Sequence, residues 1–177
     1  WWTSPCWRED NLSAHNTFLS NTRACGLPMG QNILDLLRRE HVKVLSQLDE
    51  LQRRGISDRA EKFNLMKNNL LPHMAGEERV FYPRLGERGL HDLVAAAREE
   101  HTAIRVLIDR LNSIPPADEG GWVRTMPDLR EAMRSHVDQE EKAVFAAARE
   151  RLDNAELLHI GDRFEEAKGK AHLRPLR

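Results

Sequence analysis

The sequence predicts an all-α protein: an up-down-up-down four-helix bundle with a short fifth helix at its C-terminal end. Charged residues make up 31% of the 177 residues and aromatic residues only 6%, a balance that favours helices over sheets. Apolar residues recur at alternating three- and four-residue steps through four long segments, which is the spacing of core positions in a bundle. Clusters of turn residues separate these segments, and such short connections make neighbouring helices antiparallel.

The four segments can be followed in order through their core-facing repeats. The first repeat is Leu34, Leu37, His41, Val44, Leu48 and Leu51, and the second is Phe63, Met66, Leu70, His73, Glu77 and Val80. The third is Leu90, Val94, Ala97, His101, Ile104, Ile108 and Leu111, and the fourth is Met126, Leu129, Met133, His136, Glu140, Ala143 and Ala147. The predicted breaks are 53–58, 87–89 and 113–121, and the fifth helix is predicted from about Asn154 to Lys168.

The chain is expected to form one domain, residues 31–170, between an irregular leader at 1–30 and a tail at 171–177. Its length allows a sizeable core without a structural metal or disulfides. The leader holds three tryptophans and both cysteines, Cys6 and Cys25, with no helical or strand period. It could be a disordered tail, a non-native extension or a segment whose tryptophans pack on the domain. The cysteine spacing differs from that of zinc or redox sites, so two free thiols are expected.

Six polar residues lie on the core-facing repeats and would meet at one level of the bundle: His41, His73, Glu77, His101, His136 and Glu140. A single histidine on an apolar repeat is more often a hydrogen-bonded core residue than a metal ligand. Four histidines on four helices, two of them followed by glutamate at the fourth position, would bury two carboxylates beside four imidazoles at a high cost. A cation removes that cost, so the sequence predicts a metal centre. The alternative is a polar network satisfied by buried waters.

The mixture of imidazole and carboxylate suits iron, manganese or zinc better than calcium or magnesium, which prefer oxygen ligands. Structural zinc sites use four ligands, so six convergent ligands suggest two ions. Paired ions lie about 3.5 to 4 Å apart, a distance that a carboxylate can bridge, and Glu77 and Glu140 are the predicted bridges. Ferritin-like di-iron bundles carry Glu-x-x-His on two helices, whereas this chain has the reverse order, His-x-x-x-Glu.

Four motifs, in their order and spacing, resemble those of the hemerythrin family in the form known as the HHE cation-binding domain. They are REH around His41, HMAGEERVFYP from His73, EEH ending at His101 and HVDQEEKAVF from His136, and the resemblance covers nearly all of residues 31–168. It implies a hemerythrin-like bundle that holds two iron ions with an oxo or hydroxo bridge and reacts with small ligands such as dioxygen. Zinc and manganese are the less favoured metals. By the same likeness one iron would be bound by His41 and His73, the other by His101 and His136, and the bridges would be Glu77 and Glu140.

The chain departs from the oxygen-carrying members of that family at two positions. Those members have a fifth histidine one turn after the third, where this chain has Arg105, and their last carboxylate follows its histidine by five residues, not four. If each iron takes roughly six ligands, two positions would be open or hold water, which favours peroxide or nitric oxide chemistry, or iron exchange, over oxygen carriage. Two alternatives are that Glu78 or another side chain fills one position while Arg105 reaches outward, or that Arg105 leans inward.

The other histidines and the glutamates beside the motifs are expected to lie away from the cluster. The histidines expected to be surface or terminal residues are His15, His91, His159 and His172. The glutamates expected to face other ways, as solvated or supporting groups, are Glu78, Glu99, Glu100 and Glu141. Tyr82 is expected within reach of the polar rim of the site.

The distribution of charged and apolar residues limits the partners that the chain can be expected to bind. Net charge is −1 with acids and bases interspersed, so neither nucleic acid nor an anionic membrane is an expected partner. No run of apolar residues is long enough for a membrane span, and no Sec signal is evident, so a cytoplasmic protein is expected. We expect a non-haem di-iron binding protein that reacts with dioxygen, peroxide or nitric oxide, with or without enzymatic turnover. The alternative is a role in iron homeostasis, iron sensing or iron-sulfur repair.

Overall fold

The computed structural model describes residues 30–172 and, within the last helix, side chains as far as residue 170. The predicted leader, apart from Gly30, and most of the predicted tail therefore lie outside the described residues. Within residues 30–172 the regular structure is helical throughout. No helix in this part of the chain combines the length and the apolar character that a membrane span requires.

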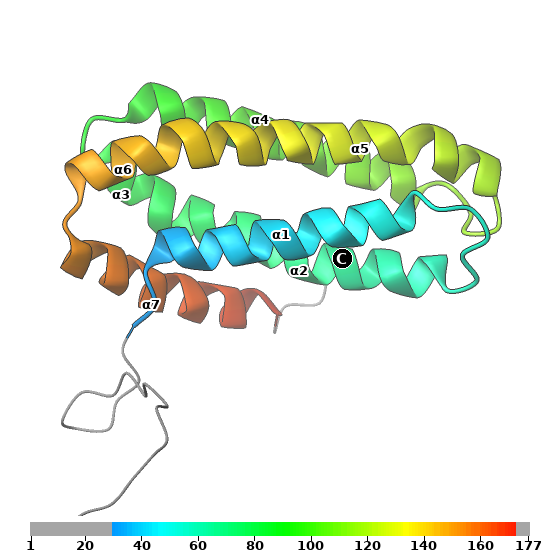
Figure 1. Ribbon diagram of the computed structural model, residues 1–177, viewed down its shortest axis with the longest axis horizontal. Coiled ribbons are helices and arrows are strands. Elements are labelled where there is room, and N and C mark those ends of the chain that lie inside the picture. The colour runs from blue at the N-terminus through cyan, green and yellow to red at the C-terminus, as the bar shows by residue number, and fades with distance from the viewer. Residues whose placement is uncertain (1–29, 173–177) are drawn as a thin grey trace, which may run out of the picture.

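Between residues 30 and 172 the chain forms five helical rods, and two of them contain a π-helical turn. In chain order the elements are α1 (Ile33–Leu51), α2 (Arg59–Gly76), the π turn η1 (Glu77–Phe81), α3 (Tyr82–Gly86), α4 (His91–Asn112), α5 (Glu119–Gln139), the π turn η2 (Glu140–Val144), α6 (Phe145–Arg151) and α7 (Asn154–His172). Four rods form the bundle, and α7 lies along α1 and α2 on the side away from α4 and α5 (Figure 1). The predicted fold class is confirmed. The fifth helix begins at the predicted residue and continues past Lys168 to His172.

Side-chain caps explain where several rods begin. The Asn32 side chain accepts a hydrogen bond from the Leu34 N–H (2.9 Å) at the start of α1. Asp118 does the same for the Gly121 N–H (2.9 Å), so α5 begins at Glu119 and includes two glycines that the sequence had suggested as part of a break. At the start of α7, Asp153 and Glu156 bond each other's backbone N–H groups (2.8 and 3.2 Å), which is a capping box.

The core has two apolar clusters with a polar layer between them. The first holds buried residues that include Leu37, Phe81, Phe145 and Phe164. The second includes Val44, Met66, Ile104 and Met133. The predicted ligands lie along the chain at the points where one cluster gives way to the other, as His41 does between Leu37 and Val44. Close packing on both sides therefore fixes the level at which these polar groups meet.

The two π turns change the register of the predicted core. The sequence repeat predicted Val80, Ala143 and Ala147 as core residues, but all three are only half-buried. A π turn accommodates one extra residue, as seen where the Tyr82 N–H bonds to the Glu77 carbonyl five residues earlier. The side chains that enter the core after the turns are therefore Phe81, Tyr82, Val144, Phe145 and Ala148. Both π turns begin at a predicted bridging glutamate, and π turns inside α-helices are frequent at functional sites.

Candidate metal centre

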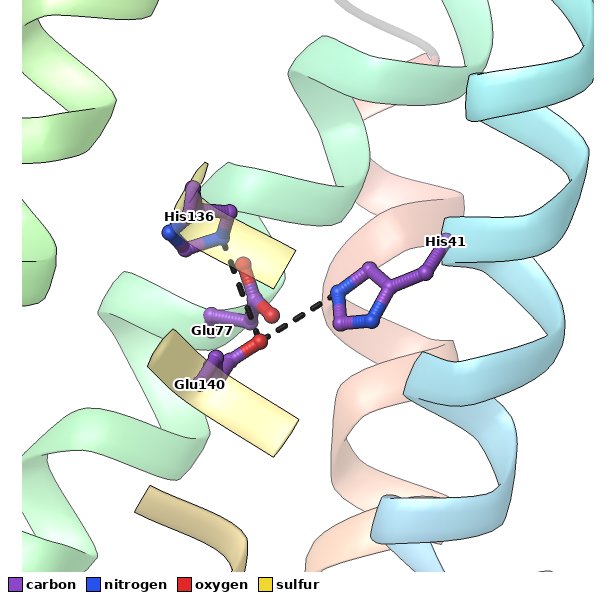
Figure 2. Close-up of side chains that lie close together, drawn as sticks. All are labelled: His41, Glu77, His136 and Glu140. Carbon is purple, nitrogen blue, oxygen red and sulfur yellow. Dashed lines mark ion pairs between the residues drawn. The ribbon is translucent and has the colours of Figure 1, made fainter. Parts of the chain in front are cut away.

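The six side chains predicted as ligands come together in the polar layer. They are His41 from α1, His73 from α2, Glu77 at the start of η1, His101 from α4, His136 from α5 and Glu140 at the start of η2. Each is at most 1% exposed. One ligand atom from each of His41, Glu77, His136 and Glu140 lies within 4.8 Å of the others, and Figure 2 shows these four side chains pointing toward one another.

Each buried carboxylate lies between two imidazoles. The Glu77 Oε1 is 3.2 Å from the His73 Nε2, and the Glu77 Oε2 is 3.3 Å from the His101 Nε2. The Glu140 Oε2 is 3.2 Å from the His41 Nε2 and 3.9 Å from the His136 Nε2; these two contacts are the dashed lines of Figure 2. All four imidazoles thus present Nε2 to the centre of the cluster.

Several of these buried atoms have no hydrogen-bond partner within the described residues. They are the Nε2 atoms of His41 and His73, both oxygens of Glu77 and the Oε2 of Glu140. Buried polar atoms in native proteins are nearly always paired, because desolvation without a bond costs about 1 to 3 kcal/mol for each group, and more for a charged one. Lone pairs of two carboxylates and two imidazoles that converge without hydrogen-bond donors fit bound cations, so the residues present match a metal site.

The opposite ring nitrogen of each of the four histidines in the cluster is hydrogen-bonded to a glutamate. The Nδ1–H groups of His41, His73, His101 and His136 donate to Glu141, Glu40, Glu78 and Glu100 respectively, at 2.9, 2.9, 2.9 and 3.0 Å. Such a bond fixes the tautomer and the ring orientation, and it leaves the Nε2 lone pair free for a metal. This arrangement is typical of histidines that bind metal ions.

These four glutamates each follow or precede a predicted ligand in the sequence, and three of them carry a cation on their outer side. Lys168 of α7 pairs with Glu40, Arg105 pairs with Glu78 at 2.7 Å, and Arg38 lies 3.5 Å from Glu141. Lys168 is only 14% exposed, whereas Arg105 is 37% exposed. The charge of the outer carboxylates is therefore partly balanced, most closely at Glu40.

The neighbouring glutamates lie as expected, either exposed to solvent or as supporting groups of the cluster. Glu99 is exposed. Glu78, Glu100 and Glu141 act as supporting groups, because they cross to a histidine on a neighbouring helix. Sequence reasoning did not single out Glu40, although it precedes His41 just as Glu100 precedes His101. Among the other histidines, His91 and His159 are exposed as expected.

Arg105 and Glu78 bond each other, and their contacts place neither residue at the centre of the cluster. The Glu78 Oε1 accepts from the His101 Nδ1–H and from the Arg105 guanidinium. Glu78 therefore lies on the outer side of the His101 ring, away from its Nε2. Arg105 likewise contacts a supporting carboxylate and not the predicted bridging residues.

Tyr82 is the site residue that sequence reasoning placed at the rim and the structure places at the centre. Its side chain is fully buried, and its hydroxyl donates to the Glu140 Oε1 at 3.0 Å and lies 3.3 Å from the His101 Nε2. Burial raises its pKa well above the usual range, and the negative charges of Glu77 and Glu140 raise it further. The register change in η1 explains the error, because it turns Tyr82 inward.

The electrostatics of the cluster favour bound positive charge. Burial lowers the pKa of His73, but the carboxylates of Glu77 and Glu40 outweigh it and raise that pKa to about 10. Burial raises the pKa of Glu77, yet His73 and His101 hold it well below its usual range. Each carboxylate thus favours a cation beside it, either a proton on imidazole or a metal ion in its place.

Comparison with known proteins agrees with this geometry. Residues 32–148 match the family described as the hemerythrin HHE cation binding domain. The chain belongs to this family. An uncharacterised hemerythrin-like protein of Schizosaccharomyces pombe is 27% identical over 141 residues, which cover 77% of this chain and 68% of that protein. A protein of Nostoc sp. named as a DNA nickase is 29% identical over 150 residues, 81% of this chain and 41% of the Nostoc protein. No solved structure matches the chain.

Membership of this family makes the chain a cation-binding bundle. The matched residues contain all six predicted ligands and the four glutamates that bond them, but they end before α7. The fifth helix therefore lies outside the residues that match the family.

Proposed function

We propose that this hemerythrin-like domain is a non-haem di-iron protein that reacts with dioxygen or a related small molecule such as peroxide or nitric oxide. The observation that carries the proposal is the convergence of four Nε2 atoms and two carboxylates, at most 1% exposed, with five of their atoms lacking a hydrogen-bond donor or acceptor among the described residues. Imidazole and carboxylate together suit iron, with zinc and manganese as the less favoured metals.

The contacts of Glu77 support two ions and not one. Its two oxygens face different histidines, His73 and His101, which belong to opposite ligand pairs in the assignment that the resemblance implies. Within each pair the rings are close, with centroids 5.0 Å apart for His41 and His73 and 4.7 Å apart for His101 and His136. A carboxylate with one oxygen at each pair fits a bridge, and Glu140 would be the second bridge.

The residues of this chain would define what the metal pair can do. Two bound irons would supply electron transfer to dioxygen, peroxide or nitric oxide. The bundle excludes bulk water from the centre, and the glutamates on Nδ1 hold each imidazole in one orientation. Tyr82 places a hydroxyl proton at the Glu140 Oε1, where it can also be donated to a small ligand held nearby.

A small diatomic or peroxide ligand is the partner that this proposal requires. We extend it with two expectations from the sequence: a cytoplasmic location and no nucleic-acid partner, the latter because the net charge is −1. The nickase activity named for the Nostoc relative belongs to a protein of which this chain covers 41%.

A role in iron homeostasis is the second candidate, and the unpartnered atoms of the cluster favour it. Because burial of these atoms without a cation destabilises the fold, metal binding contributes folding free energy. Occupancy could then act as the signal, or release of iron for iron-sulfur repair could be the function.

Metal analysis with an ultraviolet-visible spectrum tests the proposal on the whole chain purified from iron-supplied cells. We expect about two irons per chain, and His91→Ala as a matched control should keep them because His91 is exposed. One zinc, or no metal, would overturn the di-iron proposal. The reduced protein is then mixed with dioxygen, peroxide or nitric oxide: a spectral change that reverses when the gas is removed indicates binding, and sustained consumption of peroxide indicates an enzyme. A metal centre inert to all three would leave iron homeostasis as the better function.

A further inference from the structure

The helix α7 lies outside the residues that match the family, yet it packs against the half of the bundle that carries His41, His73 and Glu77. It contacts α1, α2 and η1, and Figure 1 shows it along α1 and α2 on the far side from α4 and α5. One face of the cluster is therefore covered by an element outside the residues that match the family.

Two side chains of α7, one turn apart, contact His73 directly or through one other residue. The ring of Phe164 is fully buried and packs edge-on against the His73 ring, with 6.0 Å between centroids. Lys168 pairs with Glu40, which accepts the hydrogen bond of the His73 Nδ1–H at 2.9 Å. His73 is thus held from α7 directly by Phe164 and indirectly, through Glu40, by Lys168.

Two glycines at the contact between α7 and the bundle have no room for a side chain. A Cβ on Gly76, the residue before Glu77, would lie 2.7 Å from the Phe164 ring. A Cβ on Gly161 of α7 would lie 1.9 Å from the Gln31 carbonyl oxygen at the entry to α1. Since real Cβ contacts are longer than this, both positions need glycine for α7 to seat as it does.

A pocket of about 230 Å³ opens beside this contact. It is lined by Glu40, Lys43, Val44, Asn69 and Lys168. One wall is therefore α7, and the pocket exposes the Glu40 carboxylate that holds His73. If α7 moved away, solvent or a chelator would reach the outer side of His73 from this pocket.

We propose that α7 is a clasp that retains the metal, and that Lys168 is a positioning residue that acts on His73 through Glu40. The inference rests on the proposed function in one respect, namely that the six-residue cluster binds metal. Because His73 must keep its orientation to hold a metal, metal binding stabilises docked α7, and docked α7 stabilises bound metal to the same extent. Removal of the metal therefore loosens α7, which makes the position of this helix a readout of occupancy.

The first experiment measures iron release from the whole, iron-loaded chain to a ferrous chelator under reducing conditions. Lys168→Met should speed release roughly tenfold, because loss of a partner that orients a ligand weakens metal binding by about that factor or more. Lys168→Arg, which keeps the charge, should stay near the parent rate. Lys170→Met is the matched control, because Lys170 is an exposed lysine of the same helix. Circular dichroism confirms that each variant is folded during the assay.

A second variant disturbs the docking of α7 without changing a charged residue or a proposed metal ligand. Gly161→Ala should unseat α7 at the Gln31 contact and also speed release. If it does not fold, the Lys168 variants still decide the matter, because they change one side chain in the lining of the pocket and leave the backbone contacts of α7 in place.

Hydrogen exchange of the α7 amides gives a readout that does not depend on activity. In the parent chain, these amides should exchange faster after the metal is removed, and in Lys168→Met the difference between the loaded and metal-free states should shrink. Equal release rates for Lys168→Met and Lys170→Met, or α7 exchange that ignores the metal, would overturn the clasp while leaving the di-iron proposal intact. A parent chain that binds no metal would overturn both.

Discussion

The two halves of the bundle, α1 with α2 and η1 on one side and α4 with α5 and η2 on the other, carry the same arrangement of site residues in different surroundings. In each half, a Glu-His pair on the first helix meets a His-x-x-x-Glu-Glu sequence on the second, and a π turn starts at the proposed bridging glutamate. The hydrogen bonds also repeat: Glu40 bonds His73 and Glu100 bonds His136 within a half. The last glutamate of each half bonds a histidine of the other. What the halves share is what a pair of metal ions requires, namely oriented imidazoles around two carboxylates.

The halves differ in what surrounds this shared arrangement. Five residues after its bridging glutamate, the first half has Tyr82, whose hydroxyl reaches Glu140 and His101. At the same position the second half has Phe145, whose ring stacks on His41 with 6.3 Å between centroids. The first half is also covered by α7. One side of the centre therefore has a polar hydroxyl and the other an apolar ring, so the differences, not the shared residues, are where reactivity and metal retention would be set.

The largest expected effect comes from removing a ligand from either half. His73→Ala and His136→Ala should each lose at least one of the two proposed irons, and the midpoint of thermal unfolding should fall toward that of the metal-free protein. The losses should be alike because both rings lie within 3.9 Å of a bridging carboxylate. Metal analysis and thermal unfolding check this, with His91→Ala as the control. Full iron content in either ligand variant would contradict the equivalence of the halves.

The next effect is a pH dependence of the metal-free protein, prepared by chelation. Because the pKa of His73 is about 10 in the folded protein and its ordinary value, which the unfolded chain has, is 6.5, the folded state keeps a proton that the unfolded state loses. The stability this provides is fully present below about pH 6.5 and is lost as pH rises toward 10. At about 1.4 kcal/mol per pKa unit, the fall should be on the order of a few kcal/mol.

Urea unfolding of the metal-free protein between pH 6 and 10 measures this loss. In His73→Ala the slope over that range should be much flatter. A parent protein equally stable at pH 6 and 10 would show that Glu77 and Glu40 do not hold a proton on His73.

A smaller effect is expected from Tyr82→Phe, which makes the first half resemble the second. The change removes the hydroxyl that donates to the Glu140 Oε1, and loss of a buried bond to a carboxylate costs about 1 to 3 kcal/mol. The free energy of unfolding of the metal-free protein measures it. A double-mutant cycle with Glu140→Gln should show coupling between the two positions. Additive effects would mean that the hydroxyl contributes only packing.

The sequence predicts the fold class, the ends of most helices and the convergence of six polar side chains, because the three-and-four repeat puts each of these six on the core-facing side of its helix. Beyond Glu77 and Glu140 that repeat fails. Each π turn adds a residue, so Phe81 and Val144 enter the core where Val80 and Ala143 had been predicted. The similarity of EERVF and EEKAV, each followed by an aromatic residue, is the signal that could have suggested the same local distortion in both halves.

The supporting glutamates illustrate a second limit of sequence reasoning. A helical repeat shows which residues of a helix face the core of the bundle, and Glu78, Glu100 and Glu141 do lie off that face. It does not show that a side chain at the edge reaches a histidine on the next helix, because that depends on how two helices pack. The same holds for Lys168, which is separated from Glu40 by 128 positions in the sequence.

The smallest expected effect comes from replacing the two arginines that pair with supporting glutamates. Arg105 and Arg38 are 37% and 41% exposed, and ion pairs of this exposure contribute at most about 1 kcal/mol because water screens them. Arg105→Met and Arg38→Met should therefore keep the iron and change its release rate by less than roughly fivefold, below the roughly tenfold effect expected of Lys168→Met. The same chelator assay compares all three variants. Release from Arg105→Met as fast as from Lys168→Met would mean that any cation behind a supporting glutamate matters equally, and that α7 gives the first half no special hold on its metal.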